Sequence, residues 1–179
     1  MKRFLSLFVM LVLTLGVMAQ TQHMKFMGIP LNGTISAFHQ KLVAKGGKPD
    51  VEYNKTAPVG SRHFIGTFFG EKAFIIVYYN AKTKVVYRAK AVIDRSSENK
   101  IIQKYNEVKS ALEEKYPNAY MSKGEQDGKE SVGLYTDSGW IDLYVSKYDG
   151  YSETPYSLHI DYYDVANYKK NEKSKMNDL

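Results

Sequence analysis

The segment GWIDLYVSKYDGYS, residues 139–152, decides the fold of this chain. Side chains of an extended strand point alternately to opposite faces, so every second residue of the segment shares a face. One face is apolar throughout and belongs to a core; its residues are Ile141, Leu143 and Val145. The other face carries Asp142, Tyr144 and Trp140, which is the only tryptophan of the chain. The segment therefore predicts a strand with one buried face and one aromatic, polar face.

A second strand near the C-terminus, YSLHIDYYDV at residues 156–165, repeats this arrangement. Its apolar positions alternate with His159, Asp161 and Tyr163. If the two strands pair as a hairpin, their polar and aromatic side chains share one outer face, and the joining loop adds three tyrosines. Binding patches are enriched in such rings, because they bury much area at little entropic cost. The predicted binding residues are Trp140, Asp142, Tyr144, Tyr148, Tyr151, Tyr156, His159, Asp161 and Tyr163.

The same aromatic pattern is open to a purely structural interpretation. Tyrosine and tryptophan favour strands, and cross-strand aromatic pairs stabilise an exposed sheet without any ligand. The C-terminal segment could also fold back over the outer face and cover it. Arg88 and Lys90, in the corresponding strand of the first half of the chain, predict an outer face that is basic in one half and acidic in the other.

The first half of the chain predicts one helix followed by a meander. Ile35, Phe38 and Leu42 have helical spacing, and Gly46-Gly47 ends that helix. Three segments of period-two pattern follow, separated by turn residues, and a short strand at Val51–Tyr53 precedes them. The three segments are HFIGTFFG at 63–70, KAFIIVYY at 72–79 and KVVYRAKAVID at 84–94.

The second half repeats this order. A helix with a regular apolar stripe is predicted over residues 97–115, and strands follow it. The two helices align at an offset of 70 positions, which pairs Phe38 with Val108, and the strands align at an offset of 67. The strand alignment pairs Phe74 with Ile141, Ile76 with Leu143 and Tyr78 with Val145. We interpret the pattern as an internal repeat.

The resulting prediction is an α+β fold. It consists of two tandem repeats of one helix followed by an antiparallel meander, which form one antiparallel sheet of about seven or eight strands with both helices on one face. Repeat one spans residues 26–94 and repeat two spans 97–168, within a single domain at 20–168. Residues 169–179 are predicted to be a polar C-terminal tail.

The N-terminus, MKRFLSLFVMLVLTLGVMAQTQ, predicts export. Two basic residues precede an apolar run that is too short to span a bilayer comfortably, and Val17 and Ala19 are the small residues that a signal peptidase favours. Residues 1–19 are therefore predicted to be a signal peptide, and the mature protein to be periplasmic or secreted without membrane insertion. The chain contains no cysteine, which excludes disulfides, thiol catalysis and thiolate metal sites.

Charge and motifs favour neither catalysis nor nucleic-acid binding. The formal charge of +6 falls to +2 for residues 20–168, once the two charges of the signal peptide and the net two of the tail are removed. This charge is too small for a strong nucleic-acid interaction. The four histidines have no metal-binding spacing, no phosphate loop or nucleophile elbow occurs, and GEQDGKE at 124–130 lacks the spacing of a calcium loop. No catalytic residue, metal or cofactor is predicted.

Two tandem units of helix and meander on an exported chain resemble the layout of the beta-lactamase inhibitor protein-like fold. The phrases FMGIPLNGT, KGG and FIGTFFG are similar to those of a group of uncharacterised exported bacterial proteins. Those phrases consist of glycine, proline and apolar positions, which specify turns and core. The fold resemblance implies a sheet whose open face grips a protein partner, and it carries over no residue roles.

Two functions follow from the outer face. The first is a cell-envelope module that binds a protein or peptide partner through it. The alternative is glycan binding, with Trp140 and the loop tyrosines stacking on sugar rings beside Asp142 and Asp161. A glycosidase ranks third, because its two carboxylates would have to flank a cleft about 5–10 Å apart, and two acids on an open hairpin make a poor desolvated site.

Overall fold

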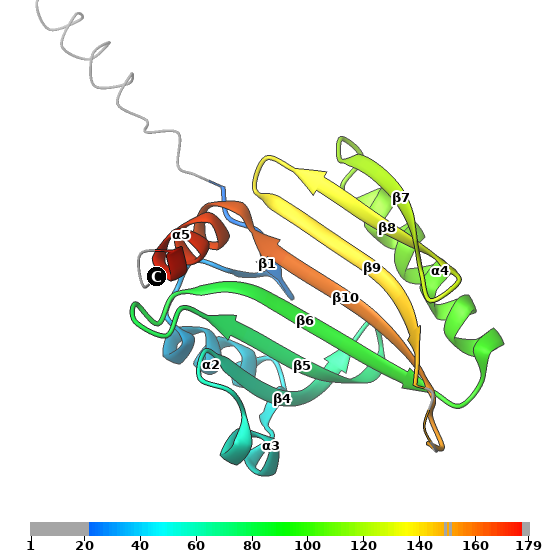
Figure 1. Cartoon of the computed structure of the whole chain (residues 1–179), viewed down its shortest axis with the longest axis horizontal. Helices are drawn as coiled ribbons and strands as arrows, with labels where there is room; N and C mark the ends of the chain where they lie inside the picture. The colour runs from blue at the N-terminus through cyan, green and yellow to red at the C-terminus, as the bar shows by residue number, and fades with distance from the viewer. Residues whose placement is uncertain (1–21, 149, 151, 177–179) are drawn as a thin grey trace, which may run out of the picture.

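Eight antiparallel strands form the main sheet of the computed structural model, which describes residues 22–148, 150 and 152–176 (Figure 1). Across the sheet their order is β3-β4-β5-β6-β10-β9-β8-β7. The predicted signal peptide and Tyr151 lie outside the described residues. The strands are β3 (Lys48–Pro49), β4 (Ser61–Phe68), β5 (Glu71–Tyr79), β6 (Val86–Arg95), β7 (Tyr120–Gln126), β8 (Lys129–Thr136), β9 (Gly139–Lys147) and β10 (Tyr156–Asp164).

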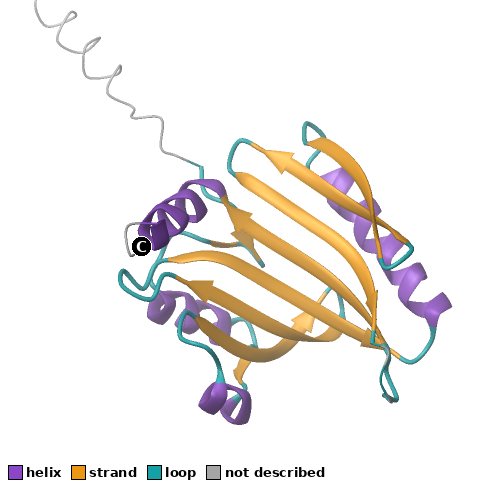
Figure 2. Ribbon diagram, viewed as in Figure 1, coloured by secondary structure: helices purple, strands orange, loops and turns teal. Residues whose placement is uncertain are grey.

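Helices cover one face of this sheet, so the fold is α+β with a mostly antiparallel sheet, as the sequence predicts (Figure 2). The two longer covering helices are α2 (Ile35–Ala44) and α4 (Glu98–Lys115). The remaining elements are the short helix α3 (Val51–Thr56), the C-terminal helix α5 (Val165–Met176) and a small sheet of β1 (Lys25–Phe26) and β2 (Ile29–Pro30). None of the described helices is long and apolar enough to cross a membrane.

The core lies between the helices and the inner face of the sheet. α4 buries one residue per turn, from Ile101 to Leu112, and α2 buries Phe38 and Leu42. Thr34 begins α2, since its side-chain oxygen accepts a hydrogen bond from the Ala37 backbone N–H. Each fully buried aliphatic or aromatic side chain contributes about 1.5–3 kcal/mol relative to an exposed one, so the helix stripes hold the two layers together.

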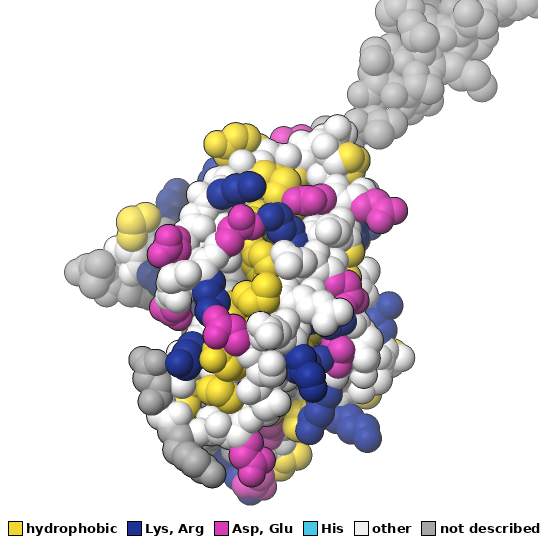
Figure 3. All heavy atoms as spheres, turned by 90° about the vertical axis from the view of Figure 1, so that its right-hand side faces the viewer, with side chains coloured by type: hydrophobic (Ala, Val, Ile, Leu, Met, Phe, Trp, Pro, Cys, Tyr) yellow, Lys and Arg dark blue, Asp and Glu magenta, His cyan; other side chains and the backbone are white. Residues whose placement is uncertain are grey.

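Ion pairs join α4 to β8, the strand next to the edge strand β7. The Lys109 ammonium lies 2.5 Å from the Glu130 carboxylate, and Lys129 pairs with Glu98 at the start of α4. Figure 3 shows this side of the molecule, where Lys/Arg and Asp/Glu side chains are interspersed around apolar ones. Exposed pairs of this kind contribute at most about 1 kcal/mol each to the free energy of unfolding. They therefore fix the position of α4 relative to β8 more than they stabilise the fold.

The two halves of the chain occupy the two halves of the sheet. Strands β3 to β6 lie on one side and β7 to β10 on the other, and β6 pairs with β10 in the middle. Within each half, the strands stand in chain order from the sheet edge to this central pair.

The strand alignment made from the sequence is wrong by one residue. An offset of 67 pairs Phe74 with Ile141, yet Phe74 points away from the helices and is 40% exposed, whereas Ile141 is fully buried. The buried residues of β5 are Ala73, Ile75 and Val77. Because β5 is apolar on both faces, its pattern contains no signal for which face is inside, and a one-residue slip exchanges the two faces.

The strand predicted at Val51–Tyr53 is also wrong, because these residues begin α3. The Asp50 carboxylate accepts a hydrogen bond from the Tyr53 backbone N–H at 3.1 Å, which is an N-cap. The Asn54 side chain donates to the His63 carbonyl oxygen at 2.7 Å and ties the helix to β4. These polar contacts outweigh the strand propensity of the short segment.

The predicted polar tail forms a helix as far as Met176. The residues that α5 buries are two asparagines, Asn167 and Asn171. The Asn80 amide donates to the Asn171 side-chain oxygen at 3.0 Å, and the Asn167 amide donates to the Leu31 carbonyl oxygen at 2.7 Å. The last helix is therefore held to the end of the sheet largely by amide hydrogen bonds.

Candidate functional site

The outer face, opposite α2 and α4, is organised in rows that cross the strands. Directly opposed residues of paired strands share a face, so the strand register places these rows. The aromatic row is Tyr78, Arg88, Tyr163, Trp140 and Tyr135. The charged row is Ile76, Lys90, Asp161 and Asp142. The apolar row is Ile65, Phe74, Val92, His159 and Tyr144.

The aromatic row is packed against α5. The rings of Trp140 and Tyr163 stack with centroids 4.5 Å apart, and the ring of Tyr168 from α5 meets Trp140 edge-on at 5.1 Å. The Arg88 guanidinium lies between the rings of Tyr78 and Tyr163, at 4.4 and 4.8 Å from their centroids. The C-terminal segment therefore covers part of the aromatic surface, which is one of the alternatives that the sequence leaves open.

At the centre of the charged row, the Asp161 carboxylate is neutralised by Lys90 of the same row and by Arg88 of the aromatic row. Arg88 donates two hydrogen bonds of 2.8 Å to the two carboxylate oxygens of Asp161, and the Lys90 ammonium lies 3.5 Å from the same carboxylate. The expected division into a basic and an acidic half is therefore wrong, because β6 and β10 are neighbours and place the charges side by side. Asp161 is 1% exposed and lies directly opposite Asp142, so the two carboxylates share a row without flanking a cleft.

Asp142 at the end of the charged row is a half-buried carboxylate. The Trp140 indole N–H donates to its Oδ2 at 3.3 Å, and no Lys or Arg among the residues that the structure describes forms an ion pair with it. Desolvation raises the pKa of Asp142 above its ordinary value of 3.8. This carboxylate would gain from a cationic partner.

A shallow hollow of about 260 Å³ lies beside Asp142, over β7 and β8. Glycine and serine line its floor, and tyrosine rings lie at its rim; these residues are Gly124, Gly133, Ser122, Ser131, Tyr135 and Tyr144. A Cβ at Gly133 would lie 2.8 Å from the ring of Tyr135, so only glycine lets that ring fold over the strand. Glycine at position 133 thus fixes where the Tyr135 ring lies beside the hollow.

The apolar row crosses five strands and is partly open to solvent. Phe74, the second of its five residues, is 40% exposed, and no described element lies over this part of the sheet (Figure 1). At one end the rings of Tyr144 and His159 stack with centroids 4.6 Å apart. His159 Nε2 lies 2.7 Å from the Ser146 hydroxyl, and its buried Nδ1 has no hydrogen-bond partner in the described part of the chain. Burial lowers the pKa of His159 to about 4, so the ring is neutral and belongs to the apolar row at neutral pH.

Six of the nine predicted residues share the outer face: Trp140, Asp142, Tyr144, His159, Asp161 and Tyr163. Tyr156 is misplaced by the prediction, because strand alternation from Leu158 turns it to the helix face, where its hydroxyl donates to Glu98. Tyr148 stands in the β9–β10 loop and is 63% exposed. Tyr151 lies outside the described residues, so its position stays a prediction.

The sequence does not reveal the first-half residues of the site. Phe74 and Val92 complete the apolar row, but their face follows only from the pairing of β5 with β6. Tyr87 joins the outer face because β6 has an irregularity opposite Tyr78 and Tyr79, which leaves Tyr87 unpaired in the ladder. Gly124 and Gly133, each inside a strand, are local signals that could have pointed to a hollow.

No group of three or more His, Cys, Asp or Glu in the described part of the chain could hold a metal ion. What the face offers is an apolar row, aromatic rings and the half-buried Asp142, which forms no ion pair with a described Lys or Arg. Comparisons of the chain with protein-family models, with curated proteins and with solved structures find no match.

Proposed function

We propose that this chain is an exported binding module of the cell envelope, which grips a protein or peptide partner through the outer sheet face. The observation that carries the proposal is the apolar row, which crosses five strands and includes the 40% exposed Phe74. Contiguous exposed apolar surface with a polar border is typical of protein contact sites. Export is inferred from residues 1–19 of the sequence.

The arrangement of the rows corresponds to the anatomy of an interface. The apolar row is bordered by the charged row, in which Lys90 and Asp161 are already paired, and the aromatic row lies beyond it. Interfaces likewise have a hydrophobic core and a polar rim. Neighbouring strands lie about 4.8 Å apart, so the five side chains of the apolar row extend over about 19 Å. This length fits an extended peptide of a few residues, or one face of a short helix.

Asp142 indicates the charge of the partner. The carboxylate is half-buried and has no described ionic partner, and desolvation raises its pKa. A lysine or arginine entering the hollow beside Gly133 would restore the favourable surroundings of the anion and would lie near the ring of Tyr144. The partner we propose is therefore a segment with apolar side chains next to a basic one.

We also propose that the sheet that carries this face consists of two tandem repeats. With the strand offset corrected to 68, the core residues Ala73 and Ile75 correspond to Ile141 and Leu143. The strand order, which mirrors itself about the β6–β10 pair, is consistent with such a duplication. The same layout supports the resemblance to the beta-lactamase inhibitor protein-like fold, in which the open sheet face is the gripping surface.

The test is a selection from a display library of short random peptides on the protein. We expect the enriched peptides to combine apolar residues with lysine or arginine. For such a peptide, Phe74→Ser should weaken binding about tenfold, or about 1.4 kcal/mol, because it removes the most exposed apolar side chain of the contact. Asp142→Asn should weaken the binding of basic peptides and leave that of their uncharged variants unchanged.

Val43→Ser is the matched control, since Val43 is 43% exposed on α2, on the opposite side of the sheet. It should leave the dissociation constant unchanged. The proposal would be overturned by a selection without enriched peptides, or by peptides that bind the Phe74→Ser protein as tightly as the unmodified one.

A further inference from the structure

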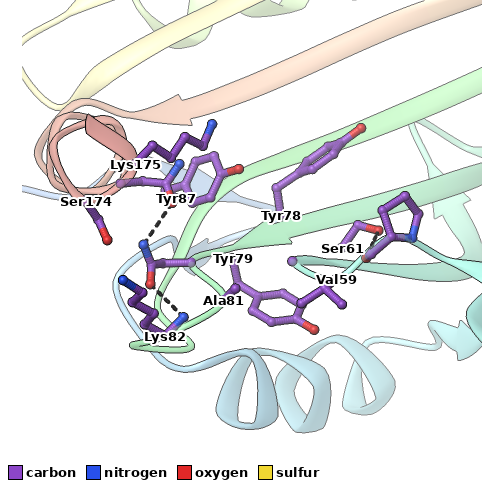
Figure 4. Close-up of a pocket in the computed structure, with 13 residues that line it drawn as sticks. Val59, Ser61, Tyr78, Tyr79, Ala81, Lys82, Tyr87, Ser174 and Lys175 are labelled. Atoms are coloured by element: carbon purple, nitrogen blue, oxygen red, sulfur yellow. Dashed lines mark hydrogen bonds between the residues drawn. The ribbon is translucent and has the colours of Figure 1, made fainter. Parts of the chain in front are cut away.

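A second hollow, the α5 pocket, lies where the β5–β6 hairpin meets the C-terminal helix (Figure 4). Its volume is about 320 Å³, near the lower end of the range for small-molecule sites. Three separate segments line it: the loop before β4, the hairpin and α5. The side chains that matter are Tyr78, Tyr79, Tyr87, Lys82, Ser174 and Lys175. None of them belongs to the apolar row.

Four side chains whose hydroxyls have no partner among the described residues line the α5 pocket, with the Tyr79 ring on the opposite side of the hairpin from those of Tyr78 and Tyr87 (Figure 4). Within the described chain, the hydroxyls of Tyr78, Tyr79, Tyr87 and Ser174 form no hydrogen bond with another residue. In Figure 4 the rings of Tyr78 and Tyr87 extend to the same side of the hairpin, and Tyr79 lies beside Val59. Each hydroxyl can both donate and accept, so together they suit a ligand that is itself rich in hydroxyls.

The lining of the α5 pocket is cationic. Two lysines, Lys82 and Lys175, line it, and none of the described lining residues is an aspartate or glutamate. Lys175 pairs with Glu172 along the helix at 2.9 Å, but both side chains are largely exposed, at 63% and 42%. Such a surface pair is weak and can be exchanged for a ligand anion.

The frame of the α5 pocket is held in place before any ligand binds. The Asn80 amide donates to Asn171 of α5, and the backbone N–H groups of Lys82 and Thr83 donate to the Asn80 side-chain oxygen. The Tyr79 backbone N–H donates to the Gly60 carbonyl oxygen at 2.8 Å, which joins the hairpin to the loop before β4. A preorganised site loses less entropy when a ligand binds.

We propose that the α5 pocket binds an acidic sugar, a saccharide ring that carries a carboxylate or sulfate. The tyrosine rings supply flat apolar surface for the C–H face of the sugar. Their free hydroxyls and that of Ser174 pair with the ring hydroxyls, and Lys175 pairs with the acid group. The volume of the α5 pocket suits one or two sugar rings. This site shares Tyr78 with the aromatic row but includes neither the apolar row nor the hollow beside Gly133, so it does not depend on the contact proposed above.

The first experiment is a titration of the isotope-labelled protein with glucuronate, followed by amide chemical shifts, with glucose as the uncharged control. We expect shift changes centred on Gly60, Lys82 and Ser174, and a dissociation constant for glucuronate roughly fivefold below that for glucose, because the acid group gains a charge-assisted contact. Equal affinities, or shift changes elsewhere on the molecule, would overturn the assignment.

Two variants test individual residues. Lys175→Met should remove the preference for glucuronate over glucose, while Lys173→Met, which changes an exposed lysine of the same helix outside the pocket, should preserve it. Tyr87→Phe retains the ring and should weaken both sugars about threefold, through the loss of one hydrogen bond. If Lys173→Met loses the preference for glucuronate as fully as Lys175→Met, the preference comes from the overall charge of α5. That result would overturn the proposed site.

The two proposals can fail separately. Phe74→Ser should leave glucuronate binding unchanged, and Lys175→Met should leave the binding of selected peptides unchanged. If Phe74→Ser abolishes the binding of both probes, the α5 pocket is not an independent site.

Discussion

His159 is a histidine that the fold keeps neutral. Its ring stacks on Tyr144, and burial, with a smaller contribution from the nearby Lys90 ammonium, lowers its pKa from 6.5 to about 4. Asp161 acts in the opposite direction but is already bound to Arg88. Protonation would place a second charge beside Lys90 in a poorly solvated position, so the folded state resists it.

This resistance predicts a pH-dependent stability. Between pH 6.5 and about 4, His159 is protonated in the unfolded chain but neutral in the folded chain. The free energy of unfolding should therefore fall as the pH falls through that window. The expected loss is roughly 1–3 kcal/mol. Urea unfolding at a series of pH values measures this loss. His159→Phe should remove most of the decrease in the free energy of unfolding between pH 6.5 and about 4.

The same substitution at His39 on α2 is the control, because it leaves the His159 ring and its proton equilibrium in place. A slope that is unchanged in His159→Phe would show that other groups carry the acid sensitivity, and that His159 is not held neutral.

At the scale of elements, α5 is the cover of the aromatic row. Its contacts with the sheet combine the ring of Tyr168 with buried asparagines, which form hydrogen bonds but bury little apolar surface. Such a helix depends on a few directional bonds, each with a net contribution of about 1 kcal/mol. Its attachment should therefore be sensitive to single substitutions.

Tyr168→Ala should expose Trp140 to water. Trp140 is the only tryptophan, so intrinsic fluorescence reports this position alone. We expect the emission maximum to move to longer wavelength and quenching by acrylamide to increase, because one of the two rings packed on the indole is removed. Lys169→Ala, at the exposed neighbouring position, should change neither. Unchanged emission in Tyr168→Ala would mean that α5 does not shield the indole.

The elements that sequence reasoning predicts well are those with a one-sided pattern. α2 and α4 have a single apolar stripe, and β9 alternates strictly between core and outer residues. The prediction fails where both faces are apolar, as at Phe74 in β5, and where polar contacts decide, as at Asp50 in α3 and Asn171 in α5. At Phe74 and Asn171 the outcome depends on partners that are distant in the sequence, whereas at Asp50 a local cap outweighs the strand pattern.

The residues of the candidate site also differ in whether the sequence predicts them. Trp140 and Asp142 could be placed on the outer face because alternation within one strand is enough. The apolar row could not be predicted, since it requires the register of five strands at once. The hollow beside Gly133 required knowledge of where the Tyr135 ring folds. Local periodicity thus identifies faces, but not the neighbours that turn a face into a site.

At the scale of the whole molecule, the pairing of β6 with β10 joins two four-stranded halves. The ladder contains eight residue pairs, from Tyr156–Arg95 to Tyr163–Arg88. The core also crosses it, since the ring of Phe26 from the first half meets Tyr162 of the second at 5.4 Å. Neither half covers its own apolar surface without the other.

Separate fragments of residues 22–95 and 98–176 should therefore not fold alone. We expect each to lack a cooperative thermal transition, because the open edge of β6 or β10 and half of the core would face water. Mixing them should restore the strand signal in circular dichroism and one shared transition. A sharp transition in either fragment by itself would show that the halves are independent domains.

Asp164 joins the two ends of the described chain. Its carboxylate accepts hydrogen bonds from the backbone N–H groups of Met24 and Asn167, at 3.0 and 2.9 Å, and lies 2.8 Å from the His23 ring. A mechanical load applied between the two ends would therefore act first on this one carboxylate and on α5. The helix would peel away before any strand of the main sheet was pulled, so the apolar row would keep its shape under tension while the aromatic row became uncovered.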